Sequence, residues 1–161
     1  MIIWNLSHIT KERQGNVDST FVNQIMTKYV LSLEKSHSLQ DAAEKMKSKK
    51  IGCVIVTDND MPVGILTERD FVTRVAAEGR PLFTEISEVM SSPLILIDHQ
   101  ETVWEASEKM KQNNIHKLPV KKNDQIVGIV TTSDIVKISS SGSDSQMRKI
   151  CDQILLRNKD K

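Results

Sequence analysis

The chain contains one stretch of sequence twice. When the sequence is shifted by 64 positions, residues 25–72 align with residues 89–136 without a gap, and 16 of the 48 aligned pairs are identical. Each copy closes with a glycine, two aliphatic residues and a Thr-x-x-Asp motif, at 64–70 and again at 128–134. A repeat of this length indicates two copies of one structural unit, each of which needs the other to bury its apolar side chains.

Local signals give the same order of elements in both repeats. Ser38 and Thr102 each stand three residues before an acid, Asp41 or Glu105, which is the capping-box spacing at the start of a helix. The predicted strands are 30–33, 53–56 and 63–66, then 94–97, 118–120 and 126–130; the predicted helices begin at 39 and 103 and run from 68 to about 78 and from 132 to about 138. An Asn-Asp pair between the last two strands of each repeat indicates a hairpin. The fold class is therefore α/β in the broad sense (α+β), with tandem β-α-β-β-α repeats packed about a pseudo-twofold axis.

Six segments are expected along the chain. They are an N-terminal arm (1–21), the first repeat (22–78), a linker (79–85), the second repeat (86–138), a Ser-rich loop (139–145) and a C-terminal amphipathic helix (146–161). Gly and Pro interrupt the linker, and serine dominates the loop. Apolar residues recur at helical spacing in the last segment, which predicts a helix that covers the body or a partner.

Composition limits the classes of partner. With 22 basic and 21 acidic residues the net charge is +1, which argues against a nucleic-acid partner, although a local basic patch stays open. Cys53 and Cys151 are far apart in sequence, so neither a disulfide framework nor a Cys-rich zinc site is expected. His8, His37 and His99 have no partners at ligand spacing, so no metal is expected. The start lacks the pattern of a signal peptide and no stretch approaches 18 apolar residues, so we expect a soluble cytoplasmic protein with no membrane partner.

The Thr-x-x-Asp motifs are the strongest candidates for a binding site. Each follows a strand and begins a helix, so Thr67 with Asp70, and Thr131 with Asp134, bring a hydroxyl, a carboxylate and unpaired backbone N–H groups into one small space. Such a junction can bind a ligand. In the simpler alternative, each aspartate only stabilises the N-terminus of its helix.

Catalytic motifs do not accompany these junctions. The chain has no Gly-x-x-x-x-Gly-Lys loop, no Gly-x-Ser-x-Gly elbow and no cluster of carboxylates. No His or Lys is placed by spacing to activate Cys53, which is expected to be a small buried side chain. We therefore expect no enzyme activity and no catalytic residue.

Several motifs together resemble the CBS domain, the module named after cystathionine beta-synthase. They are Val-Met-x-x-Pro (Val89, Met90, Pro93), Ala-x-x-x-Met (Ala106, Met110), Ile-His-Lys-Leu-Pro-Val (115–120) and the repeated Gly-h-x-Thr-x-x-Asp, where h is hydrophobic. The resemblance covers residues 22–138. It implies a CBS pair, or Bateman module, with two clefts that bind adenosine-containing ligands such as AMP, ADP, ATP, S-adenosylmethionine or NAD.

The resemblance also assigns residues to the two clefts, here named A and B. Cleft A comprises Thr67, Arg69, Asp70, Ser91, Pro93, Ile95, Ile115, His116 and Lys117; cleft B comprises Thr27, Tyr29, Leu31, Ile51, Gly52, Cys53, Thr131 and Asp134. In cleft B it implies that Asp134 accepts hydrogen bonds from both ribose hydroxyls, that Thr131 faces ribose or phosphate, and that the backbone of 51–53 holds adenine. Asp70 and Thr67 take the corresponding roles in cleft A.

The first repeat departs from the family's pattern at two positions. Tyr29 stands where the second repeat has Pro93, and Ile55 stands where it has Pro119. Cleft B is therefore expected to differ in shape. Cleft A has basic residues that can bind phosphate, so the phosphorylated ligand is expected there. These residues are Arg69, His116 and Lys117.

Two functions stay open. In the first, an adenine nucleotide or S-adenosylmethionine enters one or both clefts as a regulatory ligand, changes the stiffness or packing of the module, and an unidentified partner protein responds. No resident cofactor is required. In the second, the chain is a scaffold with unoccupied clefts that acts through its C-terminal helix and a homodimer formed by the helices of the repeats. The resemblance implies a homodimer in both cases.

Overall fold

The structure, a computed structural model, describes residues 20–139. The N-terminal arm up to residue 19, the Ser-rich loop from residue 140 and the C-terminal helix predicted over 146–161 lie outside the described residues. Within the described range the elements follow the predicted β-α-β-β-α order twice. The mixed α and β fold class is therefore confirmed.

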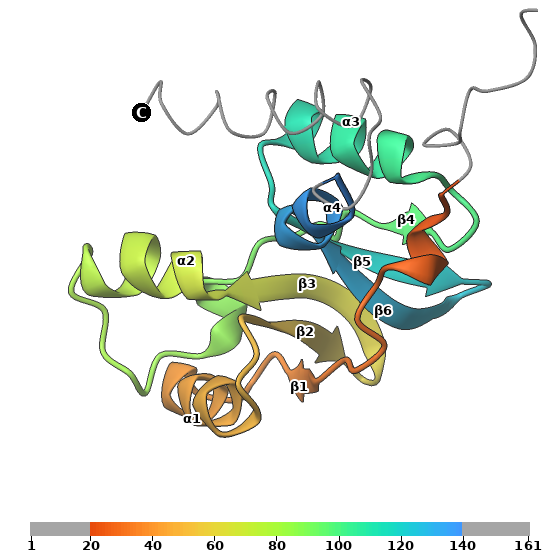
Figure 1. Ribbon diagram of the computed structural model, residues 1–161. Helices are drawn as coiled ribbons and strands as arrows, with labels where there is room; N and C mark the ends of the chain where they lie inside the picture. The colour runs from red at the N-terminus through yellow and green to blue at the C-terminus, as the bar shows by residue number, and fades with distance from the viewer. Residues whose placement is uncertain (1–19, 140–161) are drawn as a thin grey trace, which may run out of the picture. The chain divides into compact units, whose positions relative to one another are not determined.

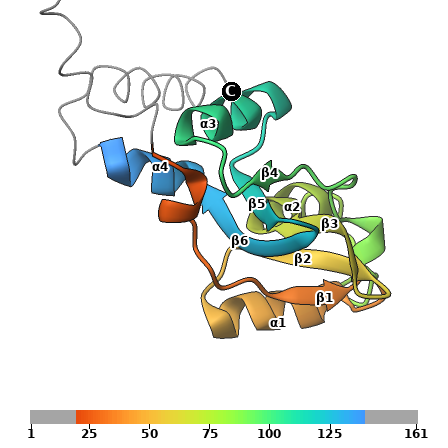
Figure 2. The ribbon, with the colours of Figure 1, turned by 90° about the vertical axis from the view of Figure 1, so that its right-hand side faces the viewer.

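The two repeats form two three-stranded sheets of identical order. In the first sheet, β1 (Ser32–Glu34) runs parallel to β2 (Cys53–Asp58), which pairs antiparallel with β3 (Met61–Thr67). Figures 1 and 2 show these three strands side by side. In the second sheet the order is β4 (Ile97–Asp98), β5 (Lys117–Lys122) and β6 (Gln125–Thr131). The central and third strands of both sheets begin and end 64 residues apart, so the repeat in sequence is a repeat in structure.

The helices follow the same shift. The long helices are α1 (Leu39–Lys49) and α3 (Val103–Asn113), and single 3₁₀ turns lie at η1 (Val22–Gln24) and η3 (Ile86–Glu88). After β3 the chain forms α2 (Glu68–Asp70) and continues as a wider π-helical segment, η2 (Phe71–Ala76); after β6 it forms α4 (Thr132–Ser139). The helix predicted from residue 68 is thus present but ends at Ala76, and its second part is not α-helical.

The first strand of each repeat is displaced from its prediction. The strand predicted over 30–33 begins at Ser32 and ends at Glu34, although the Leu31 carbonyl already accepts a hydrogen bond from Ile55 N–H at 2.9 Å. Of the strand predicted over 94–97, only Ile97 belongs to β4. The apolar run identified extended chain, but it did not distinguish backbone bonded in a sheet from extended backbone beside it.

Both predicted capping boxes are present. Ser38 Oγ accepts a hydrogen bond from Asp41 N–H, while the Asp41 carboxylate accepts from Ser38 N–H at 3.0 Å and from the Ser38 hydroxyl at 2.6 Å. Thr102 and Glu105 make the same bonds in α3. The bonds from the Ser38 hydroxyl and N–H lower the pKa of Asp41, and those from Thr102 N–H and hydroxyl lower the pKa of Glu105. These helices begin where they do because their first free N–H groups are satisfied locally.

A third carboxylate holds the β2–β3 hairpin. Asn59 and Asp60 turn the chain with φ of 49° and 64°, the left-handed conformation that a two-residue hairpin loop needs. Glu34 accepts hydrogen bonds from the Thr57 hydroxyl at 2.7 Å and from the N–H groups of Asp60 and Asn59. The bond from Thr57 is the main cause that lowers the pKa of Glu34. This cross-strand contact explains why β1 extends to Glu34.

The described residues divide into two compact units. The α1 unit comprises Thr27–Ile97 and Pro119–Ile129, and the α3 unit comprises 20–26, 98–118 and 130–139. In the α1 unit, β2 is buried on both faces: Val54 and Val56 pack with α1 residues such as Leu39, while Cys53 and Ile55 pack with Ile129 and Ile126 of β6. Figure 2 shows α1 along the sheet. A strand that is covered on both sides is a rigid support for whatever its neighbours carry.

The segments that lead into each repeat are exchanged. These lead-in segments, residues 20–27 and 84–91, each pair with backbone of the other repeat. Val22 N–H donates to Glu101 O at 2.9 Å, and Ile86 N–H donates to His37 O at 2.9 Å. The remaining bonds are Asn23 N–H to His99 O, Ser87 N–H to Lys35 O, Val103 N–H to Thr20 O and Leu39 N–H to Thr84 O. Every bond reappears after a shift of 64 residues with the repeats interchanged, so neither repeat has its full set of backbone hydrogen bonds alone.

Acid should weaken the fold through the three carboxylates with lowered pKa. Because the pKa of Glu34, Asp41 and Glu105 is lower in the folded protein than in the unfolded chain, each contributes stability that is complete above its unfolded pKa and lost as the pH falls through the folded one. We expect the free energy of unfolding in urea to decrease as the pH falls below the ordinary glutamate value of 4.5. Glu105→Gln should flatten this dependence, and Glu44→Gln, on the exposed side of α1, is the control. Equal pH profiles for wild type and Glu105→Gln would contradict the role of the cap.

Candidate functional site

The junction between β3 and α2 holds its aspartate tightly. Thr67 N–H donates to Asp70 Oδ2 at 2.8 Å, and the Thr67 hydroxyl donates to the same oxygen at 2.6 Å. Asp70 N–H closes the ring on Thr67 Oγ1 at 3.4 Å. The Asp70 side chain is 9% exposed. One carboxylate oxygen is therefore used inside the junction, and the other, Oδ1, has Arg74 Nη1 as its neighbour at 3.5 Å.

The junction between β6 and α4 repeats this arrangement. Thr131 N–H and hydroxyl donate to Asp134 Oδ2 at 3.0 and 2.7 Å, and Asp134 N–H donates to Thr131 Oγ1 at 3.2 Å. The Asp134 side chain is 16% exposed, and Lys137 Nζ lies 3.7 Å from Oδ1. Both aspartates thus cap their helices, as the simpler sequence interpretation stated, and both keep one oxygen outside the cap.

A capped carboxylate of this kind can also bind a ligand. An ionised carboxylate has about four acceptor positions, of which the two threonine bonds use two on Oδ2. The Oδ1 atom can accept from a hydroxyl group of a ligand. Because the cap fixes the plane of the carboxylate, this acceptor is already oriented, which reduces the entropy lost when a ligand binds.

The lead-in segments pair predicted wall residues with the strands that precede these junctions. Ser91 exchanges two hydrogen bonds with Ile65 on β3, at 2.8 and 3.0 Å, two residues before Thr67. Thr27 exchanges two with Ile129 on β6, both at 2.9 Å, two residues before Thr131. Thus the strand that carries the Asp70 junction is paired with the second repeat, and the strand that carries the Asp134 junction is paired with the first.

A glycine makes the first of these pairings possible. A Cβ atom on Gly64 would lie 2.7 Å from Met90 Sδ and 2.9 Å from Ser91 O. Such distances are well inside van der Waals contact. The glycine of the repeated motif therefore serves the close approach of the lead-in segment to β3, which the sequence pattern alone did not show.

The other predicted cleft residues lie in both compact units. For cleft A, the α1 unit holds Thr67, Arg69, Asp70, Ser91, Pro93 and Ile95, and the α3 unit holds Ile115, His116 and Lys117; for cleft B, the α1 unit holds Thr27, Tyr29, Leu31, Ile51, Gly52 and Cys53, and the α3 unit holds Thr131 and Asp134. Within the α1 unit, Asp70 and Cys53 are buried, whereas Arg69 and Tyr29 are exposed. The grouping into two clefts stays a prediction.

The backbone assigned to adenine is already partly engaged. Ile51 N–H donates to Met46 O at 3.0 Å, and Gly52 O accepts from Glu68 N–H at 3.2 Å. In the second repeat Ile115 N–H and His116 O make the equivalent bonds to Met110 O and Thr132 N–H, both at 3.0 Å. This backbone is therefore partly bonded within its own repeat in both halves of the chain.

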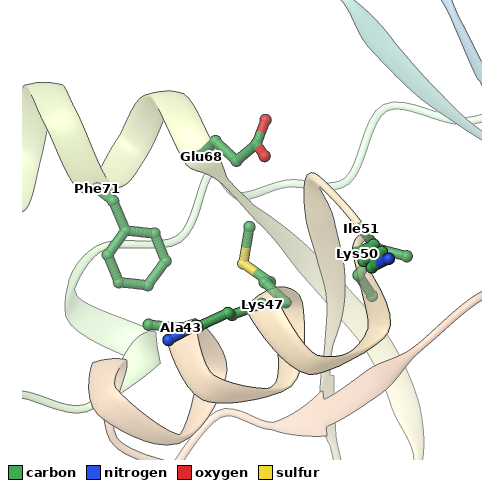
Figure 3. Close-up of a pocket in the computed structure, with 7 residues that line it drawn as sticks. Ala43, Lys47, Lys50, Ile51, Glu68 and Phe71 are labelled. Atoms are coloured by element: carbon green, nitrogen blue, oxygen red, sulfur yellow. The ribbon is translucent and has the colours of Figure 1, made fainter.

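A pocket of about 460 Å³ lies between α1 and α2. Its lining residues are Ala43, Met46, Lys47, Lys50, Ile51, Glu68 and Phe71. Figure 3 shows Glu68 and Phe71 on the helix that follows β3, with Ala43 and Lys47 on α1. Of these residues, only Ile51 was predicted from the sequence to belong to a binding site. The apolar spacing on α1 located its buried face, but the position of Phe71 depends on the tertiary fold.

Residues 20–139 contain no group of three or more His, Cys, Asp or Glu side chains that could hold a metal ion. None of the helices between residues 20 and 139 has the length and apolar character needed to cross a membrane.

Sequence comparison decides the family. The CBS domain matches the chain twice, at residues 22–77 and 86–141. The chain belongs to the CBS domain family. Both matches contain a complete set of β-α-β-β-α elements, so the protein is a CBS pair, the architecture of regulatory and sensor modules. The resemblance inferred from the motifs is thereby confirmed.

Known CBS proteins resemble the chain over most of its length. The CBS domain-containing protein YhcV of Bacillus subtilis (strain 168) is 32% identical over 134 residues, which cover 82% of this chain and 96% of YhcV. The hexameric CBS-CP12 protein from bloom-forming cyanobacteria has a TM-score of 0.68 and 32% identity, covering 72% of this chain and 69% of that one. The CBS domain pair of protein MJ0100, solved in complex with 5′-methylthioadenosine and S-adenosyl-L-methionine, has a TM-score of 0.68 and 27% identity, covering 76% of this chain and 97% of that one.

Substitution of the motif glycine should loosen the CBS pair at a defined place. Gly64→Ala places a methyl group against Met90 and Ser91, so we expect the free energy of unfolding to fall by about 1–3 kcal/mol. Chemical denaturation measures this loss. Met90→Ala removes the sulfur contact but leaves the Ser91 carbonyl, so the double variant should lose less than the sum of the single losses. A wild-type unfolding midpoint for Gly64→Ala would show that the lead-in segment does not approach β3 so closely.

Proposed function

We propose that this CBS pair is a non-catalytic sensor that binds an adenosine-containing ligand through Asp70 and Asp134 and passes the bound state to a partner protein. One observation carries the proposal. In both Thr-x-x-Asp junctions two hydrogen bonds from the threonine hold Oδ2, the aspartate N–H donates to the threonine hydroxyl, and Oδ1 is left outside the cap. Helix capping uses only Oδ2, so Oδ1, which has a basic neighbour at 3.5 Å in the first junction and 3.7 Å in the second, keeps an acceptor position for a ligand.

A ribose fits this acceptor chemically. Its two neighbouring hydroxyl groups are donors, and a carboxylate can accept from both. A hydrogen bond to a charged group contributes about 1.5–3 kcal/mol, which is enough to select ribose over a sugar without the hydroxyl. The MJ0100 CBS pair, whose structure contains two adenosyl compounds, supports the same ligand class here. AMP, ADP, ATP and S-adenosylmethionine are the proposed candidates.

Charge suggests different ligands for the two sets of residues. Arg69, His116 and Lys117 in the cleft A set are basic, whereas the cleft B set contains no basic residue. A phosphate group gains from Lys and Arg nearby. We therefore assign the phosphorylated ligand to the Asp70 site.

A sensor must convert ligand binding into a structural change that a partner protein can recognise. The wall residue Ser91 is bonded to β3 and belongs to the lead-in segment of the second repeat. A ligand that contacts Asp70 and Ser91 therefore bridges the two repeats and restrains one against the other. Ligand binding to the folded state also raises its stability by mass action.

A scaffold that works through self-association is the second candidate. Val72 is 65% exposed on the helical segment after β3, next to Phe71 in the pocket of Figure 3. This exposed aliphatic residue, beside a pocket lined in part by apolar side chains, makes the face a candidate for a surface that a partner covers. A homodimer through the helices is the proposed assembly, and the hexamer of the similar CBS-CP12 protein is the alternative to be tested.

Removal of either aspartate should weaken binding at its own site. We expect Asp70→Ala and Asp134→Ala each to cost about 1–3 kcal/mol, or ten- to a hundredfold in affinity. Isothermal titration calorimetry with AMP, ATP and S-adenosylmethionine measures the effect. Asp41→Ala removes a capping-box carboxylate of the same chemistry on α1, so it should lower stability and leave affinity unchanged. Wild-type affinity in both Asp70→Ala and Asp134→Ala would refute the sensor assignment.

A charge on the exposed helical surface should separate the copies. Val72→Glu places a carboxylate at that surface, so we expect a reduced oligomer mass in native mass spectrometry. Met61→Glu is the matched control, because Met61 is 67% exposed on the hairpin at the opposite end of β3. An unchanged mass for Val72→Glu would show that this face is not the assembly surface.

A further inference from the structure

Arg74 connects the Asp70 carboxylate to the lead-in segment of the second repeat. Its Nη1 atom donates a hydrogen bond to the Val89 carbonyl at 2.7 Å and lies 3.5 Å from Asp70 Oδ1. The side chain is 44% exposed and comes from the π-helical segment η2, one turn beyond Asp70. All three residues belong to the α1 unit. One guanidinium group therefore contacts the oxygen that the cap leaves outside and the backbone that leads to Ser91.

In the second repeat the position equivalent to Arg74 cannot make this connection. The residue 64 positions after Arg74 is Ile138, which cannot donate a hydrogen bond. Near Asp134 the basic neighbour is Lys137, whose Nζ lies 3.7 Å from Oδ1 on a side chain that is 78% exposed. At that exposure the ion pair is screened by water and contributes little. The two junctions share their threonine bonds and differ in what fixes Oδ1.

The Val89 carbonyl gives this contact a structural consequence. Val89 is buried, and two residues later Ser91 exchanges its hydrogen bonds with Ile65 on β3. Gly64, next to Ile65, admits Met90 at close range. Arg74 thus contacts both the Asp70 carboxylate and the backbone of the wall segment 89–91, which limits how far the two can move apart.

We propose that Arg74 is a positioning residue that fixes Asp70 Oδ1 relative to segment 89–91 and so makes the Asp70 site select ribose over 2′-deoxyribose more sharply than the Asp134 site. The inference rests on the proposed function and adds a specificity to one of its two sites. Arg74 occupies one side of Oδ1 and fixes the direction of its remaining acceptor position, so a ligand without the matching hydroxyl leaves that position unpaired. The Asp134 side chain is more exposed, at 16% against 9% for Asp70, so water can replace a missing hydroxyl there and the preference is weaker.

The experiment compares AMP with 2′-deoxy-AMP on variants that keep one site each. Asp134→Ala leaves the Asp70 site, and Asp70→Ala leaves the Asp134 site. In the Asp134→Ala protein we expect Arg74→Met to reduce the ratio of the two affinities, measured by calorimetry, by about three- to tenfold. Arg74→Lys keeps the charge and part of the reach, so it should restore part of the ratio. Lys137→Met in the Asp70→Ala protein is the matched control and should leave the ratio there unchanged.

The possible outcomes separate the inference from the function. If Arg74→Met lowers the melting temperature but leaves the ratio as in the parent, Arg74 is only structural and the inference is overturned. If the ratio is equal at both sites before Arg74 is changed, the inference is overturned as well. The proposed function is refuted if AMP does not bind the wild-type protein. It is also refuted if the Asp70→Ala, Asp134→Ala double variant binds AMP as tightly as Asp134→Ala alone. The inference about Arg74 is then refuted as well. A reduced ratio with an unchanged melting temperature supports the inference directly.

Discussion

The fold depends on the exchange of backbone hydrogen bonds between the two repeats. Each lead-in segment satisfies donors and acceptors of the other repeat, and the bonds recur with a shift of 64 residues. Buried backbone groups left without partners are costly, so separation of the repeats would expose a set of such groups on both sides. Folding therefore requires both copies, because each repeat supplies backbone hydrogen bonds to the strands and helix starts of the other.

The same exchange makes the candidate site a property of both repeats. Asp70 is supplied by the first repeat, while Ser91 reaches β3 from the second, and Gly64 is the residue that admits it. A ligand placed between an aspartate and a wall residue on this framework contacts chain segments that are distant in sequence. A change in occupancy can then alter the restraint between repeats without a large movement of any strand.

Local chemistry made part of this structure predictable from the sequence. Ser38 with Asp41 and Thr102 with Glu105 identify helix starts because a cap involves residues only three apart, and Asn59-Asp60 identifies a hairpin for the same reason. The lead-in pairing, the π-helical segment and the contact of Arg74 with Val89 were not predicted. Each depends on atoms that the fold brings together from positions 15 or more residues apart, or on a helical geometry that apolar spacing does not distinguish.

A duplicated backbone does not require duplicated side chains. The two repeats differ at side chains that take no part in the backbone hydrogen bonds between them. Lys35 pairs with Asp58 in the first repeat, but the equivalent residues, His99 and Lys122, cannot form an ion pair, and His99 lies beside Asp98 instead. Arg74 corresponds to Ile138 in the same way. At each junction the shared positions are the glycine, the threonine cap and the aspartate. Positions that only modify the surroundings of the carboxylate are free to differ, so one ancestral junction can acquire two specificities without loss of the fold that both support.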